Sequence, residues 1–188
     1  ILDRWLEAMT LAAGARKKAV LRAAYLKLVA DRSAIAAGAG VLPLGATLAA
    51  ATATNWTNLV VDAAIRYEAL ALPLEGMIVS PDVFKSLNAL EVQGHRVFKV
   101  SDERNTVGKL NLPGLSGDIG GITVACDPGR TGEAAEFANS RALRQYDSGV
   151  TQLQDENIIN LSKAFSVYRF GAVATEIPEA VVPIKLAA

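Results

Sequence analysis

The first part of the chain has apolar residues at helical spacing. Alanine, Leu, Lys and Arg dominate it, these residues favour helix, and no proline occurs before Pro43. The pattern predicts a helix over residues 1–37, with Gly14 as a candidate break and the glycines of 36–40 as its end. The residues of its apolar stripe fall roughly at i, i+4, i+7 and i+14, and they are Leu21, Tyr25, Leu28 and Ile35.

Residues 38–56 carry no charge and are rich in Gly, Ala and Thr, which predicts a loop. An uncharged loop of this length is a candidate for burial between subunits. A second helix is expected over 57–71, capped by Asn55 or Thr57 and ended by the following Pro73. Its expected apolar face consists of Leu59, Val60, Ala63, Ala64, Tyr67 and Leu70.

A short buried strand is predicted at 77–79, followed by a clear helix start. Ser80 is the expected cap, Pro81 fits the first turn, and Asp82 lies at the positive helix end, so a helix should run to about Leu90. A short strand is expected at 97–100, and the polar, glycine-rich stretch 101–118 predicts a long exposed loop.

From residue 119 onward the pattern changes to strands. Apolar residues alternate over 122–126, a turn follows at 127–129, and 134–146 is ambiguous between helix and strand. Further strands are expected at 158–170 and 180–186. The order of helices first and several strands later predicts an α+β fold without a regular βαβ repeat.

Charge and composition reduce the number of possible function classes. The chain has 19 basic and 19 acidic residues, which argues against a general nucleic-acid binder. Residues 1–37 hold seven Lys/Arg and three acids, a net +4 that leaves −4 for the remainder. The basic side chains lie largely off the apolar stripe and form either a solvated face or a face that docks on an acidic neighbour or a genome. They are Arg16, Lys17, Lys18, Arg22 and Lys27.

Single Cys and His residues exclude a disulfide framework and a Cys/His zinc cluster. The apolar runs fall short of the roughly 20 residues that span a bilayer, and no signal peptide is expected. Because the chain starts at Ile1 and not at Met, a processed or partial chain is expected.

The sequence predicts no catalytic, cofactor or metal site. The glycines of 117–121 lead into a strand and predict a turn, because a phosphate loop should open a helix. His95 has no second ligand at a recognisable spacing, and Cys126 falls in an apolar strand, where Cys acts as a small hydrophobe. The acid pairs at 102–103 and 155–156 fall in turn-like contexts that do not build a carboxylate dyad.

Several segments, taken in order, resemble the major capsid proteins of tailed bacteriophages, which have the Hong Kong 97-type fold. The most telling one, 76–87, has a short strand, then Ser80-Pro81, then a helix with Phe84 three residues after the proline. The segments that carry the resemblance are 23–40, 56–65, 76–87, 115–128, 133–143 and 158–184.

The resemblance implies an L-shaped subunit. Residues 1–44 would form the spine helix and glycine loop of a peripheral domain, 45–148 an axial domain, and 149–188 strands that return to the peripheral domain. An N-terminal arm and an extended loop would lie upstream of this chain. The tip of the axial domain would be the 101–113 loop, with subunit contacts at Asp102, Glu103, Arg104, Asn105 and Lys109. Spine-helix contacts would come from Arg16, Lys17, Lys18 and Arg22.

The resemblance also implies a function in assembly. Such a subunit is no enzyme and uses no cofactor or metal; it self-assembles into pentamers and hexamers of an icosahedral shell that encloses DNA without reading its sequence. Its partners would be further copies, a scaffold or maturation protease, and a portal, with no membrane. Assembly would occur in the host cytoplasm, and the product would reside in the virion capsid. An encapsulin-like nanocompartment shell and, from a different class, a small α/β enzyme or ligand-binding domain are the alternatives.

Some members of that family cross-link subunits through a Lys–Asn isopeptide bond assisted by Glu. The Asn position corresponds to Asn160, but the acid position corresponds to Val167. We therefore expect Asn160 to be a strand residue and the subunits not to cross-link themselves.

Overall fold

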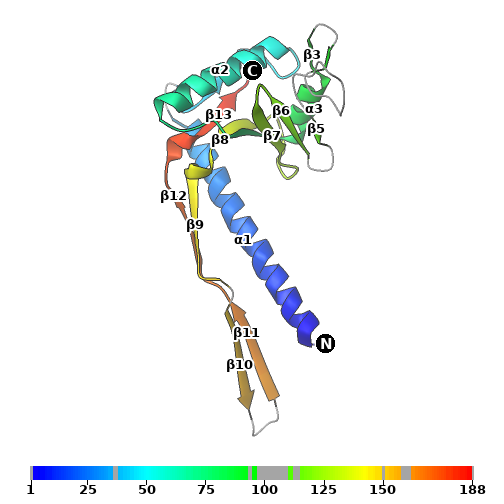
Figure 1. Ribbon diagram of the computed structural model, residues 1–188, viewed down its shortest axis with the longest axis vertical. Helices are drawn as coiled ribbons and strands as arrows, with labels where there is room; N and C mark the ends of the chain where they lie inside the picture. The colour runs from blue at the N-terminus through cyan, green and yellow to red at the C-terminus, as the bar shows by residue number, and fades with distance from the viewer. Residues whose placement is uncertain are drawn as a thin grey trace. The chain divides into compact units, whose positions relative to one another are not determined.

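The computed structural model describes residues 2–35, 38–92, 95–96, 110–111, 115–149, 151–157 and 162–187. The predicted α+β class is confirmed, with a long N-terminal helix, two further helices, a mixed sheet and paired strands outside it. The chain divides into two compact units (Figure 1). Unit 1 comprises Ile1–Lys27 and Leu143–Glu176, and unit 2 comprises Leu28–Ala142 and Ile177–Ala188.

The predicted first helix is α1 (Leu2–Ser33), which passes through Gly14 without a break and ends before residue 37. A glycine inside a helix costs only about 1 kcal/mol relative to alanine, and the helix formers around Gly14 outweigh that cost. The end is set by the chain turning back over the last turn. At Gly40 a Cβ atom would overlap the carbonyl oxygen of Arg32, so only glycine allows this close approach.

The strands of unit 1 form a long antiparallel ribbon in two sections (Figure 1). β9 (Leu143–Asp147) pairs with β12 (Gly171–Thr175), and β10 (Thr151–Asn157) pairs with β11 (Ser162–Tyr168). The predicted strand at 158–170 is confirmed over the range of β11. The turn-like context predicted for Asp155 and Glu156 is wrong, because both lie within β10, in register with Ala164 and Lys163.

Unit 2 is built on a mixed sheet with the strand order β1-β13-β8-β2-β7-β6-β5. The pairs β1–β13 and β2–β7 are parallel, and the other neighbours are antiparallel. The strands are β1 (Leu42–Pro43), β2 (Gly76–Val79), β5 (Leu110–Asn111), β6 (Ser116–Ile119), β7 (Ile122–Cys126), β8 (Ala135–Ala138) and β13 (Val181–Lys185). A separate short pair joins β3 (Glu91–Val92) to β4 (His95–Arg96).

Most of the predicted strands of unit 2 are confirmed. The strands expected at 77–79, 122–126 and 180–186 correspond to β2, β7 and β13. The ambiguous stretch 134–146 contains β8, the 3-10 turn η2 (Ser140–Ala142) and most of β9. The expected loop at 101–118 is wrong at two places, because 110–111 form β5 and 116–118 belong to β6, which pairs with it. The strand expected at 97–100 and residues 101–109 lie outside the described residues.

Two helices accompany the sheet of unit 2, α2 (Ala53–Ala69) and α3 (Pro81–Ala89). The predicted cap of α2 is wrong: Thr52 caps the helix, and its Oγ1 accepts a hydrogen bond from the Asn55 amide at 3.3 Å. Asn55 Oδ1 accepts one from the Thr52 amide at 3.0 Å, which completes a capping box and starts the helix earlier than expected. The predicted Ser80 cap of α3 is confirmed.

The core of unit 2 lies between its sheet and helices. α2 contributes a fully internal stripe that includes Trp56 and Tyr67, whereas Ala64 and Leu70, which we expected on the apolar face, are exposed. The loop expected at 38–56 contains β1 and the start of α2, and its Leu44 is buried within the unit. Other buried side chains include Met77, Val79, Val83, Leu87, Val124, Phe137 and Val182.

Two polar interactions are enclosed by this core. The Tyr67 hydroxyl donates a hydrogen bond to the Ala180 carbonyl at 2.8 Å across the turn η3 (Pro178–Ala180). Burial raises the pKa of the Tyr67 hydroxyl above its ordinary value of 10.0. On β8, the buried Glu136 carboxylate forms an ion pair with Arg130.

Replacing Tyr67 with Phe should lower the free energy of unfolding by about 1–2 kcal/mol, because the Ala180 carbonyl loses its donor. It should also reduce the loss of stability in alkali. The raised pKa means that the unfolded chain releases the Tyr67 proton first, so this residue's contribution is complete below pH 10.0 and declines as the pH rises above it. Urea unfolding at pH 8 and pH 11 would measure both effects. If the free energy of unfolding fell equally from pH 8 to pH 11 in both proteins, the alkaline loss of stability could not be assigned to Tyr67.

Replacing Arg130 with Met should destabilise unit 2 by up to roughly 3–5 kcal/mol, because the buried Glu136 carboxylate would lose its ion pair with the guanidinium. The double variant Arg130→Met/Glu136→Gln should recover a large part of that loss, since no buried charge is left. A double-mutant cycle by denaturant unfolding measures the coupling, and strictly additive losses would show that the pair does not act as a unit.

Candidate functional site

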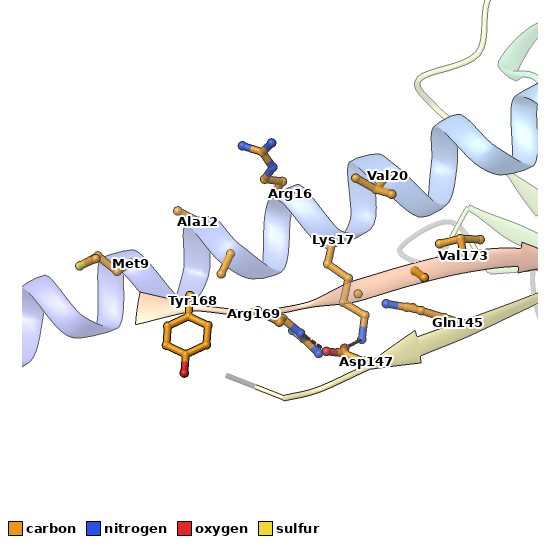
Figure 2. Close-up of a pocket in the computed structure, with 13 residues that line it drawn as sticks. Met9, Ala12, Arg16, Lys17, Val20, Gln145, Asp147, Tyr168, Arg169 and Val173 are labelled. Carbon is orange, nitrogen blue, oxygen red and sulfur yellow. Dashed lines mark hydrogen bonds and ion pairs between the residues drawn. The ribbon is translucent and has the colours of Figure 1, made fainter. Parts of the chain in front are cut away.

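Unit 1 contains a groove between α1 and the ribbon, with a cavity volume of about 550 Å³ (Figure 2). Residues of α1 from Met9 to Val20 form one wall, and the ends of β9, β11 and β12 form the other. Most of the lining is apolar, including Ala12, Ala13 and Val173. The polar lining gathers at the point where the ribbon passes from its first section to its second.

Asp147 is the centre of that polar lining. Arg169 approaches its carboxylate through both Nε and Nη2, which is the bidentate geometry that guanidinium and carboxylate groups favour. Lys17 of α1 places its Nζ 2.9 Å from Oδ2, and the Gly149 amide donates to Oδ1 at 3.1 Å. Figure 2 shows Lys17 and Arg169 converging on Asp147 from opposite walls. One carboxylate thus joins the helix and both sides of the ribbon.

The groove carries a surplus of positive charge. Arg16, Lys17 and Arg169 line it against the single carboxylate of Asp147, which leaves a formal charge of +2. Arg16 is exposed, and Figure 2 shows its side chain directed away from Asp147. Its charge therefore faces solvent at the rim of the groove, where an anionic partner could approach it.

Among the side chains whose burial is described, none in unit 1 is buried. The described buried core lies in unit 2, whereas large apolar side chains of unit 1 are exposed. Leu11 on α1 and Phe170 at the ribbon each have 69% of their surface accessible. Apolar side chains with this degree of exposure are available for contact with another molecule. The other such residues of unit 1 are Val20, Tyr146, Leu153 and Tyr168.

The four basic residues predicted as spine-helix contacts lie on α1, but their surroundings differ. Lys17 is already held by Asp147, and Arg16 lines the groove at its rim. Lys18 is exposed on α1 and is not part of the groove lining, and Arg22 is half-buried. The predicted axial-loop contacts, Asp102, Glu103, Arg104, Asn105 and Lys109, lie outside the described residues.

Sequence reasoning missed Asp147 and Arg169 as members of a site. They are 22 positions apart, and only the register of the ribbon, in which Asp147 lies opposite Gly171, brings them together. The available signal was Asp147-Ser148-Gly149, a turn sequence whose Asp side chain accepts a hydrogen bond two residues on.

The other residues that the sequence suggested for chemistry occupy turn and strand positions. Gly120 and Gly121 have φ values of 61° and 86° in the tight turn between β6 and β7, which confirms the predicted turn. Cys126 is half-buried on β7. Burial, and to a smaller extent the negative charge of Asp127, raises the pKa of its thiol. This shift is opposite to the one that a thiolate nucleophile needs. His95 lies in β4, its side chain is outside the described part of the chain, and so is Asn160.

Among the residues that the structure describes, no group of three or more His, Cys, Asp or Glu could hold a metal ion. None of the described helices combines the length and the apolar character needed to cross a membrane.

No model of a known protein family matches the chain, and a search of curated proteins finds no match.

Replacing Asp147 with Asn should loosen unit 1, because Lys17 and Arg169 would lose their shared anion. Hydrogen bonds to charged groups contribute about 1.5–3 kcal/mol, and partial exposure reduces this to about 1–2 kcal/mol here. Amide hydrogen exchange in β9 and β12 should then accelerate roughly 5- to 30-fold.

A matched control is Glu176→Gln, which removes the exposed ion pair between Glu176 and Arg144 on the same ribbon, at 3.2 Å. Exposed pairs contribute about 0–1 kcal/mol, so its effect on exchange should be small. Equal acceleration in the two variants would contradict a special role for Asp147.

Proposed function

We propose that this chain is a structural subunit of a closed protein shell, of the kind built by the major capsid proteins of tailed bacteriophages. In this proposal many copies associate into pentamers and hexamers of an icosahedral shell that encloses phage DNA without sequence-specific contacts. A scaffold or maturation protease and a portal are the accessory partners, assembly takes place in the host cytoplasm, and the chain then resides in the virion. The chain acts through its surfaces and not through catalysis.

The observation that carries the proposal is the imbalance between the two units. Unit 2 has a packed core, whereas the described side chains of unit 1 include no buried residue and several large exposed apolar ones. Burying an apolar side chain of the size of Leu or Phe stabilises a structure by about 1.5–3 kcal/mol. A unit of this composition gains most of its stability when other molecules cover it, and repeated copies of the same chain are the simplest cover.

The arrangement of elements supports the same proposal. Most of the 32-residue helix α1 and an antiparallel ribbon form unit 1, while a mixed sheet with two further helices and the last residues of α1 form unit 2. The resemblance to Hong Kong 97-type capsid proteins implies a spine helix with returning strands and an α/β axial domain. Under this proposal unit 1 corresponds to the spine helix and its strands, and unit 2 to the axial domain. Fold likeness alone does not establish function, so the exposed apolar surface carries more weight.

Two other functions are weaker candidates. A nanocompartment shell of the encapsulin type would use the same surfaces, and it would package a protein cargo instead of DNA. A small enzyme needs convergent polar groups that can do chemistry in a pocket. In the groove of unit 1 the one carboxylate is engaged by two cations and a backbone amide, which favours a role in positioning the elements over acid–base chemistry.

Electron microscopy of the complete gene product, purified at near-physiological salt, tests the proposal. We expect closed shells, or rings of five and six subunits, because each exposed surface is satisfied only in a repeating assembly. Co-expression with the neighbouring genes of its source would supply a scaffold if one is needed. A monodisperse monomer that persists at high concentration with the scaffold present would contradict the shell function. Packaged protein in place of DNA would favour the nanocompartment.

A further inference from the structure

We propose that the groove of unit 1 receives the outer face of α2 from a second copy of the chain. This inference rests on the proposed function, because it takes the occupant to be another subunit, and it names the two surfaces that meet.

α2 has a second stripe opposite its buried one. Its buried residues include Trp56, Leu59 and Tyr67, and the exposed stripe follows the same helical spacing on the other side. Val61 and Ile65, one turn apart, have 52% and 65% of their surface accessible. The exposed stripe consists of Asn58, Val61, Asp62, Ile65 and Glu68. Two large apolar side chains in the middle of an exposed helix face are typical of a helix that docks in a groove.

The charges of this stripe complement those of the groove. Asp62 and Glu68 flank the apolar pair on α2, while the groove has an apolar lining and a surplus of positive charge. Arg16 is the cation best placed to meet an acid from outside, because it is exposed at the rim and directed away from Asp147. Apolar contact in the centre with opposite charges at the edge is the usual composition of a specific interface.

The lengths of the two surfaces agree. From Asn58 to Glu68 the stripe of α2 extends about 15 Å at 1.5 Å per residue, and from Met9 to Val20 the groove wall on α1 extends about 17 Å. A single helix face of this length therefore matches the groove wall along its whole extent.

The two units have opposite net charge. Unit 1 contains nine Lys/Arg and six Asp/Glu, a net +3, and unit 2 contains ten and thirteen, a net −3. Contact between unit 1 of one copy and unit 2 of another is therefore electrostatically favoured over contact between like units. Such a contact joins two different surfaces of the same chain, so it repeats head to tail and closes rings when the rotation between copies allows it.

A charge exchange tests the inference on the complete chain. Arg16→Glu and Glu68→Arg should each weaken self-association about tenfold or more, because each places like charges across the interface. The double variant Arg16→Glu/Glu68→Arg should return to within about threefold of the original protein. Lys18→Glu is the matched control on α1, since Lys18 is exposed but does not line the groove, and it should change association less than threefold. Sedimentation velocity over a range of concentrations measures all four.

The outcomes separate this inference from the proposed function. If the original chain assembles but the double variant is as weak as the two single variants, or Lys18→Glu weakens assembly as much as Arg16→Glu, the proposed pairing is wrong and the shell function stands. If Arg16→Glu weakens self-association and Glu68→Arg does not, the groove binds another anionic surface, and the proposed pairing is also wrong. A chain that never self-associates would overturn both proposals.

Discussion

A single helix beside a two-stranded ribbon encloses too little space to bury its own apolar side chains, and this constraint governs unit 1. The hydrophobic effect rewards removal of such side chains from water wherever the cover comes from. Leu11 and Phe170 stay accessible because neither α1 nor the ribbon has a third layer within the unit to cover them. Under the proposed function, the stability of this region would depend on the concentration of further copies of the chain, as in obligate oligomers.

In unit 1, polar interactions hold the helix and the ribbon in position, because little apolar surface is buried there. Asp147 joins α1 to the ribbon through Lys17 and Arg169, and the bidentate geometry with Arg169 fixes direction as well as distance. A partly exposed centre of this kind contributes modestly to stability, so its main effect is to set the position of the groove walls. Unit 2 has the opposite balance, because side chains such as Trp56 and Phe137 are buried in a core of its own.

Local signals in the sequence predicted the elements of unit 2 well and the site of unit 1 poorly. Ser80-Pro81-Asp82 determines the start of α3 through contacts within four residues, and the alternation of 122–126 defines β7, so both were predictable. The start of α2 was misplaced because Thr52 and Asn55 cap it reciprocally, an arrangement that composition does not reveal. Asp147 and Arg169 meet only through strand register, a long-range property without a local sequence signal. The basic face of α1 was predicted as a set, but only the structure separates Lys17, held by Asp147, from the exposed Arg16.

The central claim is that copies of the chain cover unit 1. Hydrogen exchange followed by mass spectrometry, on dissociated subunits and on assembled particles, tests it most directly. The account predicts that amides of α1, β9 and β12 exchange quickly in the free subunit and become strongly protected on assembly, while β2 and β8 are protected in both states. Strong protection of α1 and the ribbon in the free subunit, with no change on assembly, would contradict it.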